Sequence, residues 1–249
     1  MLLTLSNLQA LRSQVVPNLN SQFENAFSVK LTDESKTIRD VLGQIDARLF
    51  QSYTKPAIDT LRRIIRTGIA DPGWAPAASI SSKPAAAEVR PYVYEALLTL
   101  VLVHTQVSTT APSLASQVLS YLLEQTSKEL LDAFRDARPR FDLAALMQAT
   151  LDVEFVAQTL SQYTTERAST LQAELYALLD ARTDNQARAA LQDHLPAMRD
   201  VLKRLRDQSR TEFACFKRPR RTHTGASLAG SAGQGGGVAS PTLERTATG

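Results

Sequence analysis

The chain has 249 residues, of which 43% are hydrophobic and 21% charged, and its formal net charge at pH 7 is +3. These values are ordinary for a soluble globular protein with one large domain or two small ones. The single cysteine, Cys215, excludes an internal disulfide framework and favours a reducing, cytosolic setting, and no apolar run reaches the ~18 residues that a membrane span requires.

The positive charge is concentrated at the C-terminal end of the chain. Residues 217–249 carry a net charge of +4, which leaves a net charge of −1 for residues 1–216. The sequence pI of about 9.1 therefore reflects the last residues. It is no argument that the remainder binds nucleic acid or an anionic membrane.

Apolar residues at steps of three and four predict helices through most of the chain. The opening residues, MLLTLSNLQALR, lack the basic region and cleavage site of a secretory signal and read as the interior of a helix, so we expect a fragment of a longer chain. The first helix is expected from about Thr4 to Phe27, with a kink or a division at Pro17. Its apolar face consists of Leu8, Leu11, Val15, Leu19 and Phe23.

A second helix is expected to begin at Thr32 as its N-cap, with acidic residues in its first turn. Its stripe, predicted to be buried, consists of Ile38, Leu42, Ile45 and Leu49. Pro56 predicts a break or the start of a third helix, which has Gly68 near its C-terminal end. The third helix carries Ile58, Leu61, Ile65 and Ile69 on one face.

Residues 71–90 read as a linker rich in Pro, Ala and Ser, because prolines recur too often for a long helix. Trp74 is expected to anchor this linker onto the folded body, with an exposed contact to a partner as the alternative. A second helical set begins with the clearest pattern in the chain, in which Val93, Leu97, Leu100, His104 and Val107 share one helix face.

Further helices are expected over about 112–137, 142–163 and 185–216, with another helix that begins after a cap at Thr164 or Thr165. Pro196 is expected to bend or split the last one. Short connections favour antiparallel neighbours. The fold class is therefore all-α, with elongated stacked antiparallel helical bundles.

Four segments follow from these patterns. Residues 1–70 are expected to be the end of an upstream helical bundle, 71–90 a linker, 91–217 a C-terminal helical bundle, and 218–249 a disordered basic and Gly-rich tail. The tail has too few apolar residues to offset the entropy of ordering it.

No arrangement of residues points to catalysis, to a cofactor or to a metal. The three histidines show no metal-ligand spacing, and His104 is expected to be a half-buried helix residue with a hydrogen-bond partner. Cys215 lies between Phe213 and Phe216, which favours a packed thiol over a reactive one. We therefore expect that the chain is not an enzyme. Its expected role is mechanical: it binds partner helices through its apolar helix faces.

The run Lys217 to Arg221, KRPRR, is the sharpest charge feature. Three interpretations stay open: contact with an acidic partner or anionic lipid through basic side chains, a nuclear import signal or nucleic-acid contact, or a basic helix end that complements the helix dipole. The basic side chains in question are Lys217, Arg218, Arg220 and Arg221.

Several segments together resemble the C-terminal portion of exocyst complex component two, the Sec-five family. They are FENAFSVKLTDESKTIRDVLGQIDARLFQSYTKP (23–56), YVYEALLTLVLVHTQVS (92–108) and LPAMRDVLKRLRDQSRTEFACFK (195–217). The most specific pieces are the Tyr–x–x–Glu–Ala–Leu run that begins at Tyr92 and the ending at Cys215 and Phe216. The resemblance covers about residues 5–217.

The resemblance implies a non-enzymatic subunit of stacked helical bundles, in a complex that holds secretory vesicles at the plasma membrane before fusion. It implies other exocyst subunits as partners, with small GTPases or membrane factors reached through the complex, and a cytoplasmic location, peripheral at plasma-membrane secretion sites. The family's N-terminal coiled-coil region and its GTPase-binding immunoglobulin-like domain match no part of this chain. The alternative is a helical regulatory module that Lys217–Arg221 directs to the nucleus or to nucleic acid, although nucleic acid and small-molecule substrates are not expected.

Overall fold

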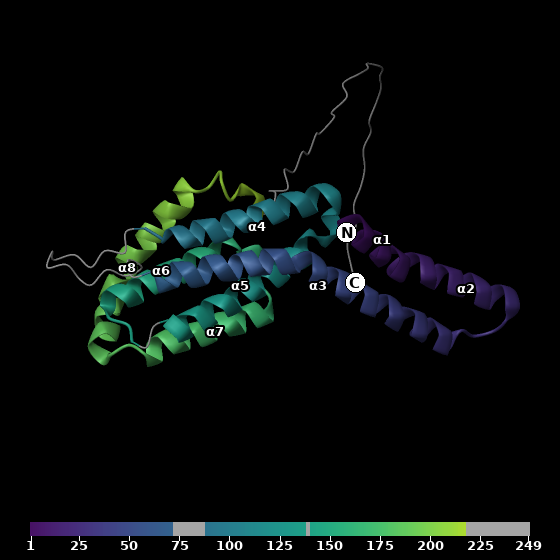
Figure 1. The fold of residues 1–249 in the computed structure, drawn as a ribbon, viewed down its shortest axis with the longest axis horizontal. Helices are drawn as coiled ribbons and strands as arrows, with labels where there is room; N and C mark the ends of the chain where they lie inside the picture. Colours follow the sequence, from purple (N-terminus) through teal and green to yellow (C-terminus); the bar gives the residue numbers. More distant parts are fainter. Residues whose placement is uncertain (72–87, 138–139, 218–249) are drawn as a thin grey trace, which may run out of the picture. The chain divides into compact units, whose positions relative to one another are not determined.

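The computed structural model describes residues 1–71, 88–137 and 140–217, which form an all-α fold (Figure 1) and confirm the expected class. The helices are α1 (Leu2–Ala10), α2 (Val16–Phe27), α3 (Thr32–Ala70), α4 (Pro91–Thr110), α5 (Ala115–Ala137), α6 (Leu143–Thr159), α7 (Glu166–Ala181) and α8 (Asn185–Gln208). Short 3-10 turns occupy Pro112–Leu114, Ser161–Tyr163 and Ala214–Phe216. The linker around Trp74 and the tail after Lys217 lie outside the described residues, so the expectations for them stay predictions.

Helix α3 runs through Pro56 without a break, which corrects the expected division into a second and a third helix. Proline lacks an N–H, so the helix loses one backbone hydrogen bond there. The loss is tolerated because the residues that follow are buried, with Leu61 1% exposed and Ile65 fully buried. Thr32 is the first helical residue of α3 and not its cap; the cap position belongs to Leu31, whose N–H donates to Oε1 of Glu24 over 2.8 Å.

The first helical stretch stays continuous up to Phe27, with a π-helical turn at Leu11–Val15 between α1 and α2. This turn ends two residues before Pro17, which has no N–H to donate to the α-helical hydrogen bonds. The stretch ends at Ser28, which adopts a left-handed conformation with φ of 53°. The chain then reverses and α3 begins.

One hydrophobic core joins the C-terminal half of α3 to α4, α5, α6 and α7, and to the end of α8. Helix α3 packs against both α4 and α5, α5 packs against α7, and α6 packs against α8. Leu61 and Ile65 therefore belong to the same core as Leu97 and Leu100. The expected boundary at 71–90 separates helices along the chain, but it does not separate two cores.

Gly68 allows a close approach between α3 and α4. A Cβ atom on this residue would lie only 2.3 Å from Cβ of Tyr92, a distance that real side chains do not adopt. Tyr92 is 5% exposed and is the second residue of α4. Gly68 lies near the C-terminal end of α3, as expected from the sequence, and the structure adds its packing contact with Tyr92 of α4.

Two buried carboxylates fix the helices to one another. Glu129 of α5 is 4% exposed and accepts hydrogen bonds from Nε of Arg62 over 2.8 Å and from Nε of Arg66 over 3.4 Å, both on α3. The bond to Glu129 raises the pKa of Arg62 above its ordinary value. Asp152 of α6 is 1% exposed and accepts from the backbone N–H of Arg90 over 3.1 Å, which holds the start of α4 against α6.

Gly68→Ala is predicted to lower the free energy of unfolding by about 1–3 kcal/mol, because the new methyl group forces α3 and α4 apart. Gly43→Ala is the matched control, since a Cβ atom there would meet only Nη1 of Arg12 at 3.9 Å. That control is predicted to raise the free energy of unfolding by about 0.5–1 kcal/mol through helix propensity. Urea unfolding followed by circular dichroism measures both; equal effects would contradict the close contact.

Glu129→Gln is predicted to lower the free energy of unfolding by about 1–3 kcal/mol, because two charge-assisted hydrogen bonds weaken at a buried site. The loss should lie near the lower bound, since the side chains of Arg62 and Arg66 are 48% and 47% exposed and stay hydrated. Asp136→Asn removes an exposed pair with Arg66 and should change stability by less than about 0.5 kcal/mol. Chemical denaturation of both variants tests the difference.

Candidate protein interaction surface

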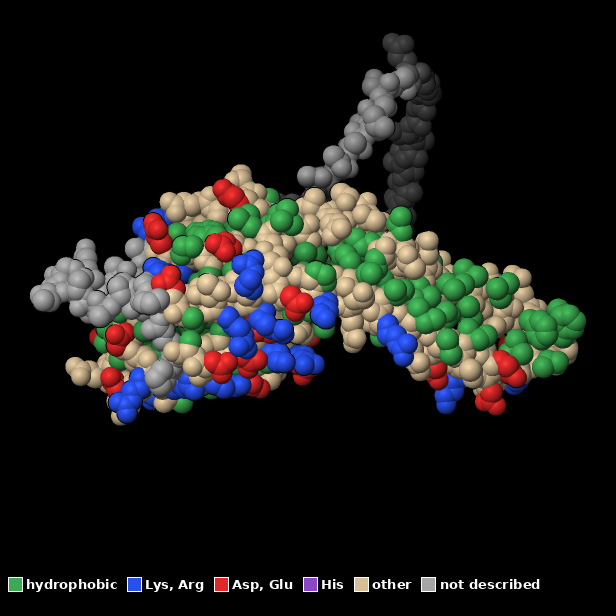
Figure 2. All heavy atoms as spheres, in the orientation of Figure 1, with side chains coloured by type: hydrophobic (Ala, Val, Ile, Leu, Met, Phe, Trp, Pro, Cys, Tyr) green, Lys and Arg blue, Asp and Glu red, His purple; other side chains and the backbone are tan. Residues whose placement is uncertain are grey.

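An apolar surface lies on the helical hairpin that α1, the π-helical turn and α2 form with the first half of α3. Hydrophobic side chains gather along this hairpin in the space-filling view (Figure 2). We call this surface the hairpin face. Its residues, between 37% and 64% exposed, are Leu11, Val15, Leu19, Phe23, Phe27, Ile38, Val41 and Ile45.

The hairpin face corrects one expectation from the sequence. The stripe of Ile38, Leu42, Ile45 and Leu49 was predicted to be buried, yet Ile38 is 40% and Ile45 is 42% exposed. The residues of the first helix behave likewise, because Leu19 is 58% exposed. The helical period was identified correctly, but within the described residues nothing covers these side chains fully.

Contacts within the hairpin hold the two arms together. Leu5, 1% exposed, anchors α1 in the core. Farther out, Nη1 of Arg12 lies 3.5 Å from Oδ2 of Asp46, and Nδ2 of Asn20 donates to Oγ of Ser35 over 2.6 Å. The face is therefore preorganised, and its residues need little further ordering when a partner binds.

Amphipathic helices bury their apolar stripe in stable folds. Isolated exposed apolar residues are normal on protein surfaces, but a contiguous set along two paired helices marks a binding site. Two antiparallel helices with an uncovered stripe form half of a four-helix arrangement. The geometry of the hairpin face therefore suits another pair of helices.

His104 and Cys215, the residues considered for metal binding or catalysis, lie where the turn Ala214–Phe216 packs against the core. His104 lies within 3.3 Å of Oγ of Ser108 and packs edge-on against Phe216, and burial lowers its pKa. Cys215 is partly buried against the core, and burial raises the pKa of its thiol. A thiol with a raised pKa is a poor nucleophile at neutral pH. Both positions match the structural roles expected of them.

Of the basic run, only Lys217 belongs to the described residues, and it is exposed after the turn Ala214–Phe216. Arg218, Arg220 and Arg221 lie outside them, so all three interpretations of the run stay predictions. The structure brings Lys217 to a pocket that Lys203 and Arg206 also line. Sequence reasoning missed these two residues, although both belong to the basic stretch KRLR of α8. In the described part of the chain, no helix has the length and apolar character to cross a membrane.

Comparison with known proteins gives a consistent result. Residues 1–216 match the model of the family described as exocyst complex component Sec5. The chain is 25% identical over 224 residues to exocyst complex component 2 of Homo sapiens and 24% identical over 218 residues to that of Mus musculus. Each match covers 87% of this chain and 22% of the relative, so the chain spans about a fifth of the length of these relatives. No solved structure matches the chain.

Leu19→Ala is predicted to change the free energy of unfolding by less than about 0.5 kcal/mol, because the side chain is largely exposed. Leu5→Ala, on the same helical stretch, is predicted to cost about 2–5 kcal/mol because it leaves a cavity in the core. Thermal unfolding of the two variants compares them directly. Similar losses would show that Leu19 is covered within the chain, and would remove the basis for a binding face.

Proposed function

Because the chain belongs to the Sec5 family of exocyst components, we propose that it acts as a non-enzymatic segment of the exocyst, the complex that docks secretory vesicles at the plasma membrane before fusion. Its place of action would be the cytoplasmic side of plasma-membrane secretion sites. The family match supports the assembly, and the exposed hairpin face is the observation that supports a role in recognition. No bond-making step is assigned to any residue.

The hairpin face is proposed to bind helices of another exocyst subunit. The relatives carry the name of a complex component, which supports a protein partner within an assembly. An uncovered stripe along two helices supports a helical partner, since helices pack side by side through such stripes. Charged side chains border the hairpin (Figure 2) and would set the register of the partner.

The energy of this contact can be estimated from burial. Complete burial of a Leu, Ile, Val or Phe side chain contributes about 1.5–3 kcal/mol. The side chains of the hairpin face are already about half covered, so each gains roughly half of this value. The total is comparable with the cost of association, about 4–15 kcal/mol. Apolar contact alone therefore gives weak binding, and further contacts in a multisubunit complex would supply the remainder.

A second proposed occupant of the hairpin face follows from the predicted role of residues 1–70 as the end of an upstream helical bundle. In that arrangement the hairpin face is covered by other helices of a longer Sec5 polypeptide. Small GTPases or membrane factors would then be reached through the complex and not through this face. Cross-linking followed by mass spectrometry separates the two occupants, because it identifies the chain to which the hairpin residues are joined.

The double substitution Leu19→Glu with Val41→Glu is predicted to reduce recovery of exocyst subunits in affinity purification at least about tenfold, because it places charges in an apolar contact. The tagged chain is purified from a native lysate and the co-purified subunits are quantified. Leu102→Glu on α4, at a side chain 72% exposed and outside the hairpin, is the matched control. Recovery that is unaffected by the double change would contradict the assigned face, and absence of exocyst subunits with the unsubstituted chain would contradict the function.

A further inference from the structure

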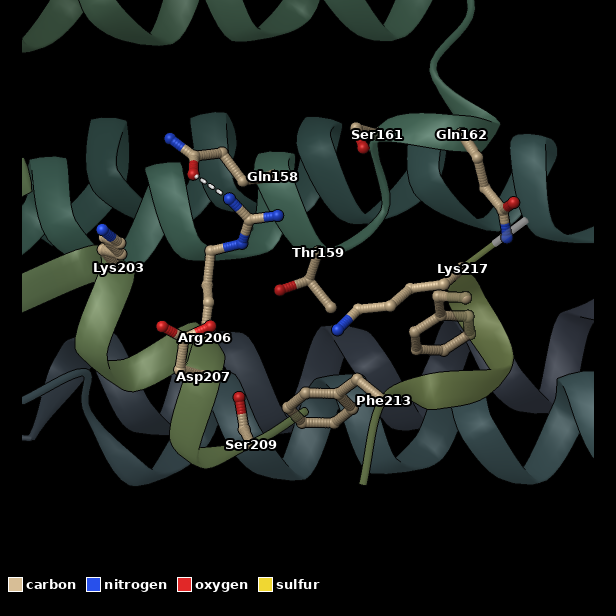
Figure 3. A pocket seen from close by; sticks show the side chains of 11 residues that line it. Gln158, Thr159, Ser161, Gln162, Lys203, Arg206, Asp207, Ser209, Phe213 and Lys217 are labelled. Carbon is tan, nitrogen blue, oxygen red and sulfur yellow. Dashed lines mark hydrogen bonds between the residues drawn. The ribbon is translucent and has the colours of Figure 1, made fainter. Parts of the chain in front are cut away.

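A second surface feature lies away from the hairpin face, where the C-terminal ends of α6 and α8 meet the 3-10 turn Ala214–Phe216. It is a pocket with a volume of about 550 Å³ (Figure 3), within the size range of small-molecule sites. We call it the basic pocket. Its polar lining includes Thr159, Ser161, Lys203, Arg206 and Lys217, with Phe213 as an aromatic wall.

Three cationic side chains come to this pocket from two segments. Lys203 and Arg206 project from the last turns of α8, and Lys217 extends across the pocket toward Thr159 from the far side (Figure 3). Among the described residues, none of the three forms an ion pair with a carboxylate. Positive charge that no internal partner neutralises favours an anionic ligand.

Arg206 is held in place by a chain of hydrogen bonds. Its Nη1 donates to Oε1 of Gln158 over 2.9 Å, and Nε2 of Gln158 donates to Oε2 of Glu154 over 3.0 Å. The other oxygen of Glu154 accepts from the hydroxyl of Tyr176 over 2.7 Å, which ties the chain to α7. Side chains fixed in this way lose less entropy when a ligand binds.

The pocket also contains groups that oppose an anion. Asp207 lines it, and α6 and α8 end beside it with carbonyl groups that together carry about one negative charge. Three cations exceed these opposing charges, so the pocket keeps a net positive charge of about +1. The hydroxyl of Ser209 donates to the carbonyl of Leu205, but the hydroxyls of Thr159 and Ser161 make no hydrogen bond to another described residue and can donate to a ligand.

We propose that the basic pocket binds a phosphate monoester. A phosphate group offers several acceptor oxygens and a charge of about −2, which matches three cations and two free hydroxyl donors. The planar guanidinium of Arg206 suits phosphate oxygens, and lysines provide flexible point charges. The open side of the pocket and the exposed position of Lys217 admit either a soluble sugar phosphate or the headgroup of a lipid. This site is independent of the hairpin face.

The test uses the full 249-residue chain and two probes. Soluble inositol trisphosphate is titrated by calorimetry, and phosphatidylcholine vesicles with and without a phosphoinositide are used in flotation. The expected result is salt-sensitive binding of the soluble probe, which the double change Lys203→Gln with Arg206→Gln weakens at least about tenfold. Binding to phosphoinositide vesicles as well would identify a lipid headgroup, whereas binding of the soluble probe alone would identify a free phosphate ligand.

The control variant, Lys128→Gln with Arg167→Gln, removes the same charges from exposed positions on α5 and α7 that do not line the pocket. Equal losses in both double variants would overturn the proposal, because they would show that only net charge matters. So would loss of binding solely on changing Arg218, Arg220 and Arg221. The proposal is also overturned if neither probe binds the unsubstituted chain. A loss of thermal stability in the Lys203→Gln with Arg206→Gln variant would then show that these cations stabilise the helix ends.

Discussion

The packing of one helix against two others supports the rest of the described structure. The C-terminal half of α3 lies against α4 and α5, with Gly68 packed against Tyr92 of α4 and Glu129 bound to both Arg62 and Arg66. A fully buried side chain such as Ile65 contributes through close packing, which tolerates no gap of methyl size. Because the same helix continues outward as an arm of the hairpin, this packing also fixes where the hairpin face is displayed.

The continuity of α3 therefore has a mechanical consequence. A break at Pro56 would have left residues 32–55 as a separate helix that could move relative to the core. Burial on the C-terminal side of the proline outweighs one lost hydrogen bond and keeps the helix whole. Under the proposed function, a contact that a partner makes with the hairpin would be transmitted to the core through this single helix.

The C-terminal end closes the fold through aromatic side chains. Phe213 packs against Tyr94 of α4 and Phe155 of α6, and Phe216 packs against His104 and Tyr163. Pairs of this kind add about 0.5–1.5 kcal/mol each beyond the burial of their area. Lys217 directly follows these aromatic residues and lines the basic pocket together with Phe213 and Phe216, so the pocket depends on the same closure.

Local patterns in the sequence were sufficient for the all-α class, for most helix positions, and for a cap of α7 at Thr164 or Thr165, of which the structure shows Thr165, because helical period and capping depend on neighbours within one turn. They also identified most of the apolar residues that form the hairpin face, all except Phe27 and Val41. They did not show that these residues stay exposed, that α3 passes through Pro56, or that Lys217 lines the same pocket as Lys203 and Arg206. Those features were decided by tertiary structure. The helical period of apolar residues shows which side of a helix is apolar, whereas the burial of that side depends on segments distant in the sequence that pack against the helix.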